Sequence, residues 1–383
     1  MENQVALAKE NNADVLYLAL ELSHKKWKLG FSDGKMPQVR QITISAGDLK
    51  TCKEETEKAK QRMGLKESVA IRSCYEAGRE GFWLHRALTQ MGIANMVVDA
   101  SSIEVNRRQR RAKTDRMDVE KLVRQLIRYG RGEHDVWRVV RVPSPEAEDN
   151  RQLHRELETL KEEKKQHRVR IQSLLFTQGM DVKVGPQFLK KLEGLQCWNE
   201  KPIPPQMKQR IVGEYHRLQL VEAQIQEAKK KQTQQVQAAA QDDAAIKKVQ
   251  MLQQLLGIGM GSSWVFVMEL FGWRQFQNRR ELAGAVGLTP TPYNSGDSVR
   301  EQGISRAGNR RVRKLLIEIA WCWLRLQPHS KLSRWYQQRF AGGGARMRRI
   351  GIVAMARRLV IDLWRYVEFG VVPEGARLRV AAQ

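Results

Sequence analysis

Val15-Leu16-Tyr17-Leu18-Ala19-Leu20-Glu21-Leu22 is a continuous apolar run with a single charge, at Glu21. A run of this length and composition predicts a buried strand. Residues 23–26 then favour a turn, and the alternating Trp27-Lys28-Leu29-Gly30-Phe31 predicts a second strand that closes a hairpin. The hairpin starts a sheet, and its first strand carries a carboxylate near its carboxyl end.

Beyond this hairpin the pattern alternates between strands and helices. Three further strands are predicted at residues 39–45, 67–76 and 95–99, and three helices at residues 48–63, 82–92 and 114–128. A hairpin followed by alternating strands and helices is an α/β pattern with a mixed sheet. Pro143 and Pro145 mark its end, so the first predicted domain spans residues 1–145.

From about residue 146 the chain is rich in charged helix formers, and its apolar residues step by three and four. A heptad seam with two polar interruptions runs through Leu153, Leu157, Leu160, Lys164, His167, Ile171 and Leu174. A second long helix, from about 206 to 240, has similar spacing. We expect an antiparallel, coiled-coil-like helical hairpin over residues 146–248, and a fragment of a four-helix bundle is the alternative.

Residues 249–383 form a third predicted domain, which is mainly helical. Gly257-Ile258-Gly259 lies between two helical patterns. This turn fits either a helix-hairpin-helix motif, whose backbone N–H groups approach a phosphate, or an ordinary helix–helix connection. Residues 291–298 are predicted as a loop. The loop contains Ser295, which composition alone assigns to a turn and not to chemistry.

The composition indicates a polyanionic partner. The chain of 383 residues carries a formal net charge of +25 and has a pI of about 10.1. Positive charges in such excess repel one another unless a polyanion neutralises them, and nucleic acid is the usual polyanionic partner. A membrane is not expected, because the chain has no apolar run of 18 residues and no signal peptide. The expected location is the cytoplasm, and cysteines without a C-x-x-C spacing indicate neither a zinc site nor disulfides.

Basic residues concentrate in two places. Six of the eleven residues from 106 to 116 are Arg or Lys, a density that favours phosphate contact over a merely solvated face. The predicted nucleic-acid contacts in this first patch are Arg107, Arg108, Arg110, Arg111 and Lys113. Those in the second patch are Arg306, Asn309, Arg310, Arg311 and Arg313.

Four carboxylates lie at the ends of predicted strands and helices in the first domain: Glu21, Glu76, Asp115 and Asp118. The two aspartates are three residues apart and share a helix face. Hard oxygen ligands suit Mg²⁺ or Mn²⁺, and two such ions can clamp the attacking and leaving oxygens of a phosphoryl transfer. Taken alone, the two aspartates are explained by the favourable interaction of a carboxylate with the dipole at the start of a helix. The set of four beside a basic stretch favours a metal site.

Several motifs occur in a fixed order along almost the whole chain. They are Ala19-Leu20-Glu21-Leu22-Ser23, Tyr75-Glu76-Ala77-Gly78, Lys113-Thr114-Asp115-Arg116-Met117-Asp118, Gly257-Ile258-Gly259, Ala285-Val286-Gly287-Leu288-Thr289-Pro290, Ser295-Gly296 and Gly303-Ile304-Ser305-Arg306-Ala307-Gly308-Asn309. Together they resemble the insertion-sequence one-ten family of transposases, which includes the Piv-type DNA invertases.

The resemblance implies a RuvC-like first domain with a ribonuclease H fold, a coiled-coil insertion and a C-terminal transposase domain that carries a serine. The family's acidic set is usually Asp, Glu, Asp, Asp. Carried over, it makes Glu21, Glu76, Asp115 and Asp118 the metal ligands, with Glu21 departing from the usual aspartate. Ser295 matches the serine nucleophile. The resemblance also implies a structured noncoding (bridge) RNA that pairs with donor and target DNA, in a bacterial, nucleoid-associated setting.

Recombination must rejoin strands without an external energy source, which favours a covalent route. Attack by a serine hydroxyl keeps the phosphodiester energy in a phosphoserine link, whereas attack by water loses it. The resulting prediction is a transposase or site-specific recombinase that acts as a homo-oligomer, a dimer or a dimer of dimers. Ser295 and the acidic set would form one composite site from different protomers. The alternatives are a hydrolytic RuvC-like nuclease of the junction-resolvase type and a non-catalytic nucleic-acid scaffold.

Overall fold

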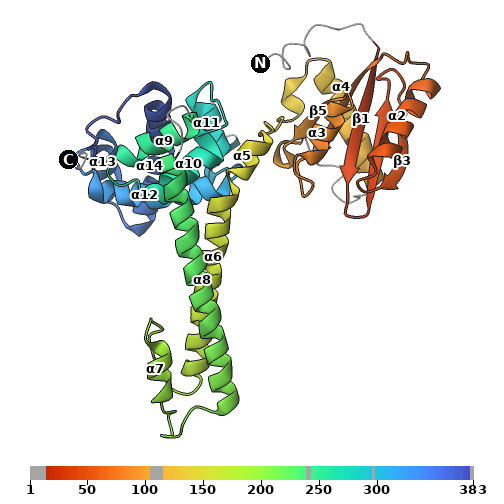
Figure 1. The fold of residues 1–383 in the computed structure, drawn as a ribbon. Coiled ribbons are helices and arrows are strands. Elements are labelled where there is room, and N and C mark those ends of the chain that lie inside the picture. Colours follow the sequence, from red (N-terminus) through yellow and green to blue (C-terminus); the bar gives the residue numbers. More distant parts are fainter. Residues whose placement is uncertain (1–13, 104–114, 239–242, 296–297, 380–383) are drawn as a thin grey trace. The chain divides into compact units, whose positions relative to one another are not determined.

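The computed structural model describes residues 14–103, 115–238, 243–295 and 298–379. The chain divides into two compact units, Met1–Val142 and Pro143–Gln383, which are described separately (Figure 1). The second unit contains both the predicted helical hairpin and the predicted C-terminal domain, so the finer division at residue 248 stays a prediction.

The first unit is built on a mixed sheet of five described strands. The strands are β1 (Val15–Leu22), β2 (Lys26–Ser32), β3 (Arg40–Ser45), β4 (Ala70–Glu76) and β5 (Ala94–Val98), in the order β3-β2-β1-β4-β5. β1 is antiparallel to β2 and parallel to β4. As the central strand it is covered on both faces, which is why its sequence is continuously apolar. The predicted hairpin and mixed sheet are confirmed.

Helices cover both faces of this sheet. The side chains of Leu16, Leu18 and Leu20 point to one face, where α2 (Leu49–Arg62) and α3 (Trp83–Gln90) pack. Tyr17 and Ala19 point to the other face, which α4 (Asp115–Gly130) covers. The short helices η2 (Ala100–Ser102) and η4 (His134–Val136) complete the described part of the unit.

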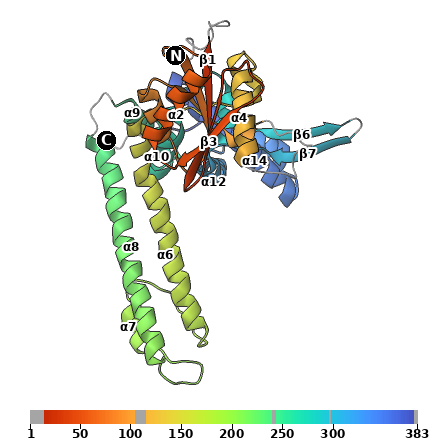
Figure 2. The ribbon, with the colours of Figure 1, turned by 90° about the vertical axis from the view of Figure 1, so that its right-hand side faces the viewer.

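The second unit begins with α5 (Pro145–Asp149) and with two long antiparallel helices, α6 (Gln152–Phe176) and α8 (Pro205–Ala238), which lie side by side in Figures 1 and 2. The two polar interruptions of the heptad seam have partners across this pair. Lys164 Nζ lies 2.9 Å from Glu222 Oε1, and His167 Nδ1 lies 2.7 Å from Glu214 Oε2. These pairs favour one register of the two helices. A helical hairpin is therefore present, whereas its supercoiling stays a prediction.

The connection between α6 and α8 contains α7 (Phe188–Glu193), a short helix that the sequence did not predict. Phe188 and Leu192 from α7 are buried against Tyr215 and Ile211 of α8. The Tyr215 hydroxyl shares its one hydrogen between the carbonyl oxygens of Gly185 and Pro186, at 2.9 and 3.1 Å. These contacts fold the connection back onto the helices.

The rest of the second unit is a helical bundle around one core. Its described elements are α9 (Ala244–Gln254), α10 (Met260–Phe266), η5 (Val267–Phe271), α11 (Arg279–Val286), α12 (Arg310–Leu326), α13 (Lys331–Tyr336), η6 (Gln337–Ala341) and α14 (Ala345–Phe369). Gly257, with φ +102°, forms the turn between α9 and α10. The mainly helical prediction for this part of the chain is confirmed.

One local prediction was wrong. Residues 291–298 were expected to be a loop, but β6 (Pro290–Ser295) and β7 (Ser298–Ile304) form an antiparallel two-stranded hairpin. Figure 2 shows the hairpin extending from the helices of the second unit. The two prolines at 290 and 292 suggested a loop, but strands at a sheet edge accept proline because one side of each strand needs no ladder hydrogen bond.

In the described part of the chain, no helix is both long enough and apolar enough to span a membrane.

Candidate functional site

Two predicted metal ligands lie on neighbouring parallel strands of the first unit. The register pairs Leu20 of β1 with Tyr75 of β4, so Glu21 and Glu76 follow at equivalent positions. Side chains alternate along a strand, and Ala19 and Cys74 belong to the core under α4. Glu21 and Glu76 therefore belong to that same face of the sheet.

The helix α4 runs antiparallel to β1 across this face. A Cβ atom at Gly30, the partner of Ala19, would lie 3.0 Å from Val123 Cγ2 and 3.2 Å from Val119 Cγ2. At the other end of the helix, Gly130 lies beside Tyr17. The first turn of α4 thus points toward the carboxyl end of β1, where Glu21 is found.

Asp118 lies on this first turn of α4 and is half-buried, whereas Glu76 is exposed. Asp115 is the first residue of the helix, and its side chain lies outside the described residues. The structure therefore places Glu21, Glu76 and the start of α4 on one face of the sheet, at the carboxyl ends of the parallel strands β1 and β4. Hard oxygen donors of this kind fit Mg²⁺ or Mn²⁺.

The grouping of possible metal ligands can be judged for the described side chains alone. Among the side chains that the structure describes, no three His, Cys, Asp or Glu are grouped closely enough to hold a metal ion. The four carboxylates therefore remain predicted ligands. The predicted phosphate contacts Arg107, Arg108, Arg110, Arg111 and Lys113 also fall outside the described residues.

Ser295 belongs to the second unit and is the last residue of β6. Its backbone pairs with Ser298, the first residue of β7, so the two serines flank the tip of the hairpin. The side chains of residues 292–302 lie outside the description. The backbone pairing with β7 therefore fixes the place of Ser295 beside the tip of the hairpin.

Two glycines close the base of this hairpin. Gly287 ends α11 with φ +67°, and Gly308 precedes α12 with φ +96°. A Cβ at Gly287 would lie 1.9 Å from the Ala307 oxygen, and one at Gly308 would lie 2.3 Å from the Ala285 oxygen. Only glycine fits at either position, because both the backbone angle and the space exclude a side chain.

Backbone hydrogen bonds then join the two glycine segments. The N–H of Asn309 donates to the Ala285 oxygen at 2.9 Å, and that of Ser305 donates to the Thr289 oxygen at 2.9 Å. The motifs 285–290 and 303–309 are thus two halves of one structure. Together they fix the direction in which β6 and β7 leave the helical bundle.

The second predicted basic patch includes side chains that also stabilise this unit. The Asn309 side chain caps α12 by accepting from the N–H of Val312 at 3.1 Å. Arg311 pairs with Glu158 of α6, and Arg313 Nη1 donates to the Val286 oxygen at 3.0 Å. Burial, with the neighbouring Arg306 and Arg310, lowers the pKa of Arg313.

Of this patch, Arg306, Arg310 and Arg311 are exposed. Arg306 has φ +56°, a left-handed conformation that is uncommon for a residue with a side chain. Nucleic-acid contact at Arg306, Asn309, Arg310, Arg311 and Arg313 stays a prediction.

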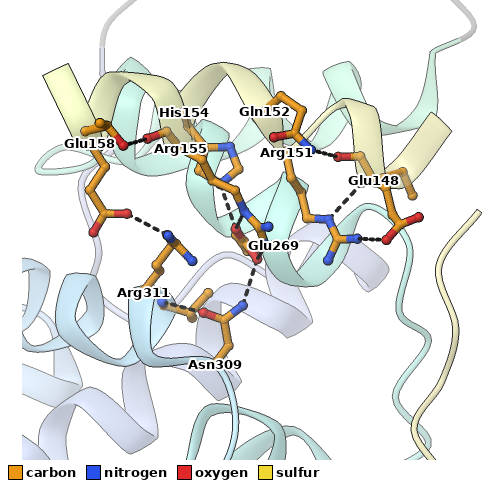
Figure 3. A network of polar contacts seen from close by, with 12 residues as sticks. Glu148, Arg151, Gln152, His154, Arg155, Glu158, Glu269, Asn309 and Arg311 are labelled. Carbon is orange, nitrogen blue, oxygen red and sulfur yellow. Dashed lines mark hydrogen bonds and ion pairs between the residues drawn. The ribbon is translucent and has the colours of Figure 1, made fainter. Parts of the chain in front are cut away.

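A buried carboxylate joins this patch to the helical hairpin (Figure 3). Glu269 of η5 is 1% exposed. His154 Nε2 and Arg155 Nε donate to its Oε1 at 2.8 and 2.9 Å, and the Asn309 amide donates to its Oε2 at 2.9 Å. Burial alone would raise the pKa of Glu269, but the hydrogen bonds from His154 and Arg155 hold it well below its usual range.

The sequence pattern did not predict the Glu269 network. A single acid inside the apolar run Trp264-Val265-Phe266-Val267-Met268-Glu269-Leu270-Phe271 was the available signal. Buried carboxylates are rare unless they are paired, so such an acid predicts a cationic partner elsewhere in the chain.

Comparison with known proteins identifies the chain. A family model described as "Transposase IS116/IS110/IS902 family" matches residues 249–334. A putative transposase, y4rJ, of Sinorhizobium fredii is 39% identical over 380 residues, which cover 95% of this chain and 94% of the relative. The chain belongs to the IS110/IS116 family of transposases.

More distant relatives cover less of the sequence. The transposase for insertion sequence element IS1328 of Yersinia enterocolitica is 24% identical over 197 residues, 50% of this chain and 56% of the relative. A probable family 20 transposase of Pseudomonas aeruginosa is 29% identical over 178 residues, 45% of this chain and 49% of the relative.

The transposase is therefore an enzyme that cuts and joins DNA strands. The region matched by the family model contains Ser295, both closing glycines and Glu269. It ends before α14.

Proposed function

We propose that this transposase cuts and rejoins the DNA of an insertion sequence through Ser295, assisted by a Mg²⁺ or Mn²⁺ site formed by Glu21, Glu76, Asp115 and Asp118. The observation that supports the acidic site is the convergence of two adjacent strand ends and the first turn of α4 on one face. The RuvC-like, ribonuclease H type of fold is part of this proposal.

The covalent step conserves the energy of the broken bond. The Ser295 oxygen attacks the phosphorus of a phosphodiester, its proton passes to solvent, and the bond from phosphorus to one sugar oxygen breaks. That sugar oxygen takes up a proton and leaves as a hydroxyl. A hydroxyl of another strand then attacks the phosphoserine and releases the serine, so no external energy source is needed.

The four carboxylates fit a divalent cation in their donor type and their negative charge. Such an ion, when bound, would supply positive charge that favours the ionised hydroxyl and stabilises the leaving oxygen. The carboxylates themselves would offset the charge of the ion and fix its place at the edge of the sheet. They would thereby position the phosphate that Ser295 attacks.

The proposal includes two partners, a structured noncoding guide RNA and further copies of the chain. The net charge of +25 allows both DNA and RNA to be bound. Large apolar side chains are exposed on the paired helices, including Phe176 and Leu220, at 74% and 61%. The paired helices α6 and α8 would offer the seam along which a second copy of the chain packs. The proposed setting is the nucleoid in the bacterial cytoplasm.

Ser295→Ala tests the nucleophile, with Ser298→Ala as the matched control across the hairpin. The purified chain, together with the RNA that purifies with it, is incubated in Mg²⁺ with labelled plasmid DNA that carries the element. Denaturing gels then show any DNA linked to protein. We expect adducts with the natural chain and with Ser298→Ala, and none with Ser295→Ala.

Adducts that persist in Ser295→Ala would remove this serine from the mechanism. Cut DNA without adducts in the natural chain would instead support the hydrolytic nuclease. Sequencing of the co-purifying RNA tests the guide, because one discrete RNA that can pair with two DNA sites is expected. A random mixture of cellular RNA would contradict the guide.

The metal site is tested with Asp118→Asn, and Glu120→Gln on the same helix is the control. Glu120 forms an ion pair with Arg124 at 2.6 Å within α4. Asp118→Asn should lower adduct formation by at least about 100-fold, while Glu120→Gln should leave it unchanged. Equal activity of both variants would exclude Asp118 from the site, and unchanged activity in EDTA would exclude the metal.

A further inference from the structure

A large groove lies on the second unit, beside the long helix α14. Its cavity volume is about 1860 Å³, which exceeds the roughly 300–1,000 Å³ of small-molecule pockets. Its walls come from α14, from α13 and from the base of the β6–β7 hairpin. A groove of this size suits a segment of a polymer better than a small ligand.

The α14 wall carries a stripe of arginines, with the apolar Ile350 and Val353 between its two halves and the acidic Asp362 in its second half. The residues that face the groove follow helical spacing and include Arg346, Arg349, Arg357, Arg358 and Arg365. The opposite side of the same helix is buried in the core of the bundle. At 1.5 Å per residue the stripe is about 28 Å long. That length corresponds to about eight base pairs along the axis of a duplex, at 3.4 Å per step.

Most of the groove's charge is not neutralised by the protein. Among the described residues that line it, eleven are Arg or Lys and two are Asp or Glu. One of the two acids, Glu374, is paired with Lys331 at 2.6 Å. In the described part of the chain neither Arg349 nor Arg357 forms an ion pair. Such a concentration of unpaired cations favours a polyanion as the occupant.

Aromatic and apolar side chains lie between the arginines. The guanidinium of Arg358 lies 3.9 Å from the centre of the Trp335 ring, and Phe340 contacts the edge of the same ring. Ile350 is 47% exposed on the same wall. This combination of a charged track with stacking surfaces is typical of proteins that hold nucleic-acid strands.

The groove also extends to β6, the strand that carries the proposed nucleophile Ser295. Pro290 and Thr291 at the start of β6, and Gly303 and Ile304 at the end of β7, line it. Ser295 is at the other end of β6. A strand that lies in the groove would therefore pass along the base of the hairpin that carries this serine.

We propose that this groove binds the backbone of the DNA that the transposase cuts, with Arg349 and Arg357 of α14 as phosphate contacts. DNA is favoured over RNA because the groove is continuous with the hairpin of Ser295, where the cut strand must lie. The inference rests on the proposed role of Ser295 and adds a DNA-binding surface that lies partly beyond residues 249–334.

The test compares the double variant Arg349→Ala/Arg357→Ala with Arg348→Ala. Arg348 is exposed on the same helix but does not line the groove. Binding of the full chain to a labelled 30-base-pair DNA duplex and to a labelled 30-nucleotide RNA hairpin is measured in EDTA at several salt concentrations. EDTA separates binding from strand cutting.

The double variant should bind the duplex about tenfold more weakly at physiological salt, and its salt slope should fall by about two. Arg348→Ala should bind as the natural chain does. Arg349→Lys/Arg357→Lys should recover most of the affinity, and unchanged thermal unfolding would show that all variants fold.

Two outcomes would overturn the inference. Unchanged duplex binding by the double variant would exclude the groove as a DNA site. Loss of RNA binding alone would assign the groove to RNA. Either result would leave the Ser295 adduct assay unaffected, so failure of the groove and failure of the nucleophile can be distinguished.

Discussion

Glu269 is the residue on which the polar contacts at the base of the helical hairpin converge. It receives hydrogen bonds from two residues of α6 and from the cap of α12. A buried carboxylate is stable only while such partners remain, and loss of one charge leaves the others buried without compensation. The residue therefore ties the stability of two distant sequence segments to one ionised group.

Glu269→Gln should lower the free energy of unfolding by about 3 kcal/mol at pH 7. The pKa of Glu269 is depressed in the folded chain from an ordinary value of 4.5. Its stabilisation is therefore present above about pH 4.5 and is lost as the pH falls toward the folded pKa. Below pH 4.5 the difference between the natural chain and the variant should shrink by about 1.4 kcal/mol per pH unit.

Urea unfolding at pH 7, 4.5 and 3.5 measures this difference. Glu158→Gln is the control, since Glu158 pairs with Arg311 at the surface and both side chains are about half exposed. That control should change stability by less than about 1 kcal/mol. A Glu269→Gln effect that stays constant over this pH range would contradict the assignment of an ionised, stabilising carboxylate.

The β6–β7 hairpin depends on its base more than on its own strands. An isolated two-stranded hairpin is marginally stable in water. Here the segments on either side of it are joined by the close approach of Gly287 and Gly308. The orientation of Ser295 is therefore decided several residues away from the serine, where the chain leaves and re-enters the helices.

Gly308→Ala should destabilise the second unit by at least about 2 kcal/mol, because its φ of +96° and the nearby Ala285 oxygen exclude a Cβ. The unfolding temperature should fall by at least about 4 °C, and the Ser295 adduct should be lost. Gly284→Ala is the matched control in α11, where a Cβ meets nothing within 4 Å. It should be neutral or stabilising. Equal thermal unfolding of the two variants would show that the base is not closed as described.

The sequence predicted those elements whose periodicity is set by burial alone. The apolar run of β1 and the heptad spacing of α6 and α8 follow directly from which faces are covered. The hairpin of β6 and β7 was missed, because Pro290, Pro292 and Asn294 also fit a loop. Its backbone is held by the glycine segments, a contact that sequence spacing does not show.

The candidate site was predictable only in part. Glu21, Glu76 and Asp118 could be named from sequence, but their common face requires the register of β1 with β4 and the direction of α4. The Glu269 network and the groove could not be derived in the same way. Each brings together residues that are far apart in sequence, such as His154 with Asn309, or Thr291 with Arg357.

At the scale of the whole molecule, the proposed chemistry is divided between two units. The carboxylates belong to Met1–Val142 and Ser295 to Pro143–Gln383. Each unit has its own buried core. Compact units with separate cores can fold on their own.

Residues 1–142 produced alone should therefore unfold cooperatively, and the fragment should form no covalent adduct with DNA. Thermal unfolding followed by circular dichroism, with residues 143–383 as the companion fragment, checks this expectation. A fragment 1–142 that shows no cooperative transition would mean that the sheet depends on the rest of the chain. Leu18→Asp, a charge in the fully buried centre of β1, should abolish the transition and serves as the unfolded reference.

The glycines at 287 and 308 also limit which substitutions the transposase gene can accumulate. Selection can accept many residues at an open position such as 284, whereas positions 287 and 308 admit only one amino acid each. A mutation that replaces either glycine is expected to prevent formation of the Ser295 adduct, whichever residue it introduces. Copies that have lost a glycine at 287 or 308 can therefore be classed as decayed from the nucleotide sequence alone, before any assay of movement.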